Sequence, residues 1–161
     1  MICLILAVGT NSLAAKEIHQ HKSLDIGDMP IPKILLDVSR DEVDGVNVHV
    51  NIENYILNAP SSVDTEHKDY LQGHAHVFVN GVKRQRLYGQ DIHIPTEWLV
   101  KGVNQIAISL NSHRHENWVY ENKSIVGSAF INPDAEELIL HNYSSQPLTK
   151  LHANHNQHTH H

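Results

Sequence analysis

The dipeptide Asn80-Gly81 is the feature that most constrains what this chain can fold into. A two-residue turn of type I′ requires positive φ at both central residues, and Asn-Gly adopts that conformation readily. In "HVFVNGVKRQRL" an apolar run from Val77 to Val79 precedes the turn, and a second segment follows from Val82 onward. They predict an antiparallel hairpin with strands near 73–79 and 82–88. This favours an all-β chain.

Further strands are predicted by residues that alternate between apolar and polar. Apolar residues occupy every second position across 46–52, and the same pattern appears across 103–110. A period of two indicates strands with one buried face. Only residues 134–141 show a helical pattern. Shorter candidate strands, separated by turn residues, run over 34–38, 92–94 and 125–131. Short strands at such spacing predict an antiparallel β-sandwich.

The chain is long enough for one domain, which we expect to carry an extension at each end. It has 161 residues, enough for a single hydrophobic core. It begins "MICLILAVGTNSLAA", an apolar run followed by small residues, which is typical of a secretory signal peptide although the basic start is missing. A buried N-terminal strand is the alternative, since a membrane span needs about 20 apolar residues. The expected divisions are a signal peptide (1–15), an N-terminal arm (16–32), the β-sandwich domain (33–143) and a disordered His-rich tail (144–161).

The expected signal peptide implies export to the periplasm or the extracellular space. The composition limits the classes of partner and of metal ligand that the chain can use. The formal net charge is −6, with Lys and Arg scattered. This balance argues against nucleic acid or an anionic membrane as a partner. The only cysteine, Cys3, lies in the expected signal peptide, so the mature chain would have no disulfide and no thiolate ligand. Histidine is abundant instead, with 15 residues.

Two His-x-His pairs are the candidate metal ligands of the domain. Because strand side chains alternate, His74 and His76 would share one face, about 6.5–7 Å apart. His113 and His115 repeat the spacing after a later strand, and His93 follows the hairpin. If strands that are adjacent in sequence pair, these five imidazoles converge at one end of the sandwich. The alternative is that the histidines only decorate an ordinary sheet.

The tail is a second, separate candidate for metal binding. A tract so polar and biased has no apolar content to fold, and it is typical of a metal-capturing arm with weak sites. A remnant of an affinity tag is the alternative. The tail histidines are His152, His155, His158, His160 and His161. His49, His67 and His141 are expected on the surface, and His19 and His21 in the arm.

The available donors restrict the metal and the chemistry. Imidazole ligands without thiolates suit Cu(II), Zn(II) or Ni(II) and exclude a blue-copper centre. We expect copper or zinc, with another exported metal-handling protein as a candidate partner. The sequence contains no recognisable Ser/His/Asp triad, carboxylate pair or phosphate-binding glycine loop. It therefore indicates no catalytic residues.

Several segments together resemble a group of small exported bacterial domains. In order these are "GHAHVFVNG", "RLYG", "DIHIP", "LVKGVNQIAISLN" and "SHRH". The group combines a Gly-His-x-His strand, a hairpin, a closing strand and a later histidine. The resemblance covers residues 34–131. It implies an immunoglobulin-like fold with matching histidines at His74, His76, His93 and either His113 or His115, but no settled activity.

Two enzyme families also place His-x-His on a strand: the copper–zinc superoxide dismutases and the α-type carbonic anhydrases. This chain lacks the dismutase cysteines and is too short for the anhydrase sheet. The sequence thus predicts an all-β, immunoglobulin-like or cupredoxin-like sandwich that is exported and handles or sequesters copper or zinc. The first alternative is a non-catalytic structural or interaction domain. The second is a small metalloenzyme of the dismutase type.

Overall fold

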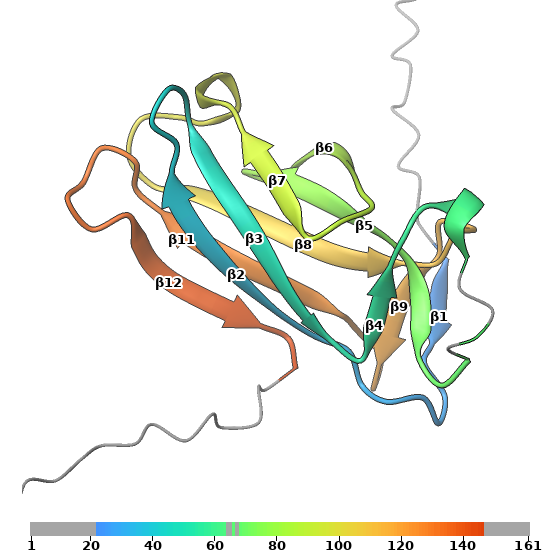
Figure 1. Cartoon of the computed structure of the whole chain (residues 1–161). Helices are drawn as coiled ribbons and strands as arrows, with labels where there is room; N and C mark the ends of the chain where they lie inside the picture. Colours follow the sequence, from blue (N-terminus) through green and yellow to red (C-terminus); the bar gives the residue numbers. More distant parts are fainter. Residues whose placement is uncertain (1–21, 64–65, 67, 147–161) are drawn as a thin grey trace, which may run out of the picture.

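The computed structural model describes residues 22–63, 66 and 68–146. They form two β-sheets packed on each other as a sandwich (Figure 1), so the all-β prediction is confirmed. The expected signal peptide, residues 16–21 of the expected arm with His19 and His21, His67 and the tail histidines lie outside the described residues. Within the described residues no helix has the length and apolar character that crossing a bilayer requires.

The larger sheet has nine strands within the described residues, and β8 lies in its middle. β8 (Asn104–Asn111) pairs antiparallel with β5 (Leu71–Val79) on one side and with β11 (Val126–Ile131) on the other. β6 (Val82–Leu87) pairs with β5, and β12 (Ile139–Ser144) pairs with β11. Four short strands complete this sheet: β1 (Ser23–Asp25), β4 (Tyr55–Leu57), β9 (Asn117–Tyr120) and β10 (Lys123–Ser124).

The smaller sheet has the order β2 (Lys33–Arg40), β3 (Val46–Glu53) and β7 (Asp91–Ile94), all antiparallel. Figure 1 shows β2 and β3 running across the face of the larger sheet. The described residues also form two short 3-10 helices, η1 (Pro60–Ser62) and η2 (Thr96–Trp98). The apolar sets predicted for 46–52 and 103–110 largely fill the space between the sheets. The fully buried residues of these two sets include Val46, Val48, Val50, Ile106, Ile108 and Leu110.

The predicted hairpin is confirmed and is tied to the centre of the sheet. Asn80 and Gly81 have φ of 51° and 77°, and Val79 pairs with Val82 directly across the turn. The Asn80 side chain also accepts a hydrogen bond from the backbone N–H of Gln105 at 2.9 Å. The turn therefore sets the register of β5 and β6 and anchors both to β8.

The helical prediction for residues 134–141 is wrong, because this stretch forms the turn and the second strand of a hairpin. Ile139 lies opposite Ile131, and the N–H of Asn132 donates to the C=O of Leu138 at 2.8 Å. An isolated helix of this length gains little stability of its own. The edge of β11 offers backbone hydrogen bonds to a neighbouring strand, and residues 139–141 pair with it instead of forming a helix.

The expected N-terminal arm contributes a strand to the fold. β1 lies inside residues 16–32 and pairs in parallel with β9. Ile26, just after it, is only 3% exposed and packs in the core. Part of the segment expected to be an arm therefore belongs to the packed domain.

Replacing Gly81 with alanine tests the turn. The left-handed φ of Gly81 should make Gly81→Ala lower the free energy of unfolding by about 1–2 kcal/mol. A Cβ there would meet nothing within 4 Å, so the cost is conformational. Gly89→Ala is the matched control, since Gly89 is equally open and has no left-handed φ. Urea denaturation measures both, and equal losses would contradict a type I′ turn.

Candidate metal centre

β5 is buried on both of its faces, and this places two histidines in the interior of the protein. Ala75 and Val77 point into the sandwich core and are 0% exposed. His74 and His76 alternate with them and so lie on the opposite face, as the sequence predicts. They are nevertheless only 1% and 0% exposed. The outer face of β5 is thus covered, and two imidazoles occupy the covered space.

A third imidazole, from the connection between β8 and β9, completes a cluster. The Nε2 atoms of His74 and His76 are 3.0 Å apart. The ring centroid of His115 lies 4.9 Å from that of His74 and 6.1 Å from that of His76. One ligand nitrogen from each of the three residues lies within 4.8 Å of the others. We call His74, His76 and His115 the histidine triad.

The distances in the histidine triad approach those of ligands on one ion. Zinc–imidazole bonds are about 2.0–2.1 Å long, so two nitrogens of a tetrahedral site lie about 3.3 Å apart. The separation of 3.0 Å between the Nε2 atoms of His74 and His76 is close to this value. A small movement of His115 would bring its nitrogen to the same ion. The triad can therefore supply three of the ligands of one metal ion.

The loop 112–116 holds His115 in an uncommon backbone conformation. His115 has φ of 68°, which is left-handed and rare for a residue with a side chain. Its N–H donates to the C=O of Ser112, and the N–H of Ser112 donates to the C=O of Glu116, each at 2.9 Å. These bonds close the loop and set the direction of the His115 side chain. Backbone strain of this kind tends to occur at functional sites.

Close backbone contact at the start of β5 positions His74. His74 lies opposite Asn111 in the register of β5 and β8. A Cβ on Gly73 would lie only 2.2 Å from the carbonyl oxygen of Asn111, so no larger residue fits there without a shift. The Tyr55 hydroxyl donates to the same oxygen at 2.9 Å. Gly73 thus allows the two strands to approach just before the first histidine.

Two basic residues of β6 lie beside the triad, because a β-bulge changes the register of β5 and β6. Arg86 lies opposite His76, and the next pair after the bulge is Phe78 with Lys83, so Arg84 is passed over. The Lys83 Nζ lies 3.1 Å from Nε2 of His76. Arg84 instead stacks on the Trp98 ring at 5.5 Å. Bulges often re-aim side chains in this way near functional sites.

Burial keeps His74 suited to coordinating a cation. Burial is the largest of the causes that lower the pKa of His74 to about 4, and the charges of His115 and Arg86 act in the same direction. Burial and Arg86 also lower the pKa of Lys83. His74 is therefore neutral at pH 7. A neutral imidazole has the lone pair that a metal needs.

The expected convergence of five histidines is only partly realised. His113 lies beside the triad, with its ring 6.3 Å from that of His74, but its Nε2 is within hydrogen-bond distance of Asn58 Oδ1 at 3.0 Å. The expectation does not hold for His93, because β7 pairs with β3 of the smaller sheet and not with β6. The Nδ1 of His93 lies 3.2 Å from Asn47 Oδ1 on an exposed face.

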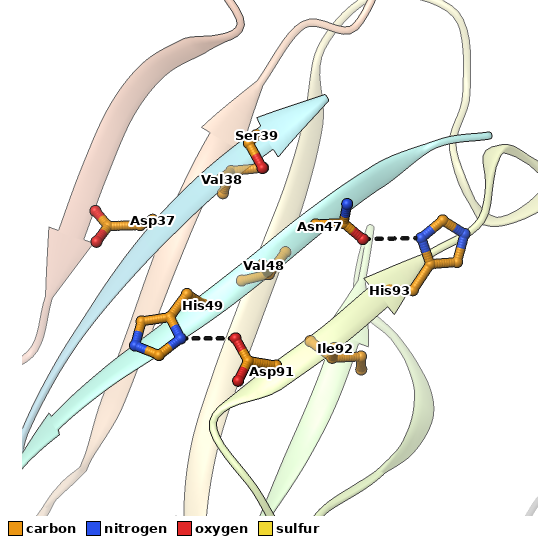
Figure 2. A pocket seen from close by; sticks show the side chains of 9 residues that line it. All are labelled: Asp37, Val38, Ser39, Asn47, Val48, His49, Asp91, Ile92 and His93. Carbon is orange, nitrogen blue, oxygen red and sulfur yellow. Dashed lines mark hydrogen bonds and ion pairs between the residues drawn. The ribbon is translucent and has the colours of Figure 1, made fainter. Parts of the chain in front are cut away.

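His93 and His49 line a hollow of about 450 Å³ on the outer face of the smaller sheet (Figure 2). His49 is exposed as predicted, and its Nδ1 lies 2.7 Å from Asp91 Oδ1. His49 and Asp91 are direct cross-strand partners, as are Asn47 and His93. The separate hydrogen bonds in Figure 2 describe a polar sheet surface. His141 is also exposed, as expected.

Sequence reasoning missed the basic residues beside the triad. The run "VKRQRL" showed that β6 is basic, but regular alternation would place Lys83 and Arg86 on opposite faces. Only the bulge brings both toward His76.

No family model, curated protein or solved structure matches the chain. The geometry of the site therefore carries the functional argument.

The lowered pKa of His74 predicts a pH-dependent loss of stability in the metal-depleted protein. In the unfolded chain His74 takes up a proton near pH 6.5, whereas in the folded protein it does so only near pH 4. The folded state is therefore favoured above pH 6.5, and up to about 3 kcal/mol is lost as the pH falls toward 4. Denaturation in a chelating buffer at several pH values measures this loss. His74→Gln should lose less stability over the same range, and an equal loss would contradict a buried, neutral His74.

Proposed function

We propose that this protein binds one divalent transition-metal ion, copper or zinc, through His74, His76 and His115. We further propose that it is exported and handles or sequesters that ion. The observation that carries the proposal is the triad itself, whose three ligand nitrogens lie within 4.8 Å of one another. The triad is built from a buried strand face and a strained loop, and it brings together residues 41 positions apart in the chain, from 74 to 115.

The stability of the fold does not explain why such a cluster is buried. Within the described residues no group hydrogen-bonds Nδ1 of His74, although this atom is buried. A buried polar atom left without a partner costs about 1–3 kcal/mol. Apolar side chains would fill the same space at lower cost. A metal ion bound through Nε2 of His74 and His76 would leave Nδ1 of His74 as it is, but its coordination bonds would offset the cost of burying the cluster, which supports a binding role.

The donor set limits which ions fit. Three imidazoles suit Zn(II) and Cu(II), whereas Mg²⁺ and Ca²⁺ prefer oxygen ligands. Because the triad is held by β5 and by a closed loop, little chain entropy is lost when an ion binds. A tight site for one ion of zinc or copper follows from these two properties.

Alanine substitutions test the ligand set. His74→Ala, His76→Ala and His115→Ala should each weaken the tightest zinc site by more than about 100-fold, because loss of residues that only orient ligands already costs about 10- to 100-fold. His49→Ala and His93→Ala, on the other sheet, are the matched controls and should leave this affinity unchanged. Competition against a chromogenic chelator measures the affinity.

Circular dichroism shows whether each variant is folded, and His74→Gln is a second, polar substitution at the same ligand. Together they separate loss of a ligand from loss of the fold. Equal weakening by all five alanine substitutions would mean nonspecific binding by histidine. Absence of a tight site in the folded wild-type protein would favour a structural or interaction domain instead.

Deleting residues 151–161 separates the triad from the tail. The five tail histidines would bind only after the chain around them is ordered, at about 1–2 kcal/mol per residue fixed. The deletion should therefore lower the number of zinc ions bound and leave the tightest affinity nearly intact. Isothermal titration of both proteins measures the two quantities. If the deletion abolishes the tightest site, the tail supplies the ligands and the proposal is wrong.

A further inference from the structure

The two cations beside the triad are at odds with a site that binds only a metal ion. Lys83 Nζ lies 3.1 Å from Nε2 of His76, and Arg86 is the direct cross-strand partner of His76. Both positive charges would repel a divalent ion held by the triad. Within the described residues neither side chain forms an ion pair with a carboxylate. No carboxylate of the described residues therefore neutralises their charges.

The arrangement depends on an irregularity of the sheet. The bulge between β5 and β6 puts Lys83 opposite Phe78, which lies on the same face of β5 as His76. Without the bulge, Arg84 would take that position, and Arg84 instead packs against Trp98. Lys83 and Arg86 are both exposed, and Lys83 contacts His76, so both charges lie on the side of the triad that borders on solvent.

Three protein ligands leave a coordination position open on a four-coordinate ion. In zinc sites of this kind the remaining position takes water or another exogenous ligand. Since the imidazoles are neutral ligands, a bound divalent ion would keep its full charge, and Lys83 and Arg86 add to it. An anion in the open position would be attracted by the metal and would accept hydrogen bonds from both side chains.

We propose that the metal-loaded triad binds a small monovalent anion, such as a carboxylate, in the open coordination position, with Lys83 and Arg86 holding it. This inference rests on the proposed metal site and adds a ligand class to it. The protein would then take up metal and anion together, each strengthening the binding of the other. By linkage, the anion raises the affinity for the metal by the same factor as the metal raises the affinity for the anion.

Azide is a suitable probe, because an azide bound to Cu(II) produces a charge-transfer absorption band. The full chain is loaded with half an equivalent of Cu(II), so that the tightest site is filled first, and is then titrated with azide. Acetate is added in a second titration to displace azide. We expect the band to appear in the wild-type protein and acetate to remove it.

Three variants and one control assign the anion site. Lys83→Met and Arg86→Gln should each weaken azide binding several-fold, and the double variant should weaken it at least tenfold. Lys101→Gln is the control, since this exposed lysine lines a different hollow, near Arg40 and Asp134. It should leave azide binding unchanged.

The affinity for copper alone should not fall in these variants. Without anions that bind copper, removing a neighbouring positive charge should leave copper affinity equal or raise it, whereas a merely structural role would weaken both affinities. Copper binding without an azide band, or equal azide affinity in the double variant and the wild type, would overturn the anion site and leave the metal site standing. Failure of the wild-type protein to bind copper tightly would overturn both.

Discussion

The antiparallel pairing of β5 with β8 is the constraint on which the rest of the structure depends. It directs Ala75, Val77 and their neighbours into the core, so His74 and His76 must occupy the other face of the same strand. The chain that leaves β8 then turns back at residues 112–116 and brings His115 against this face. One strand pair therefore completes the hydrophobic core and assembles the histidine cluster.

Burial and charge give the site its chemical character. His74 and His76 lie where water has little access, which keeps His74 neutral at pH 7 and able to coordinate a cation. The two cations of β6 lie at the outer side of the cluster. A divalent ion and an anion together suit this distribution of charge better than either alone. The polar rows of the smaller sheet, by contrast, satisfy their hydrogen bonds with each other.

Local patterns predicted much of the fold, and long-range pairing decided what they missed. The Asn80-Gly81 turn and the alternation in β3 and β8 are local signals, and the structure confirms them. The shared face of His74 and His76 follows from the same alternation. The place of His93 depends on β7 joining the other sheet, and that of Lys83 on a bulge. Neither the partner strand of β7 nor the bulge has a signal in the residues near it, so neither was predictable from the sequence.

Anomalous diffraction at the zinc edge tests the central claim most directly. Crystals of the full chain grown with one equivalent of zinc would show where the ion binds. We expect one dominant peak within bonding distance of a nitrogen from each of His74, His76 and His115, with a fourth ligand that does not come from the protein. A dominant peak beside His49 and His93 on the smaller sheet, with none at the triad, would contradict the proposed metal site.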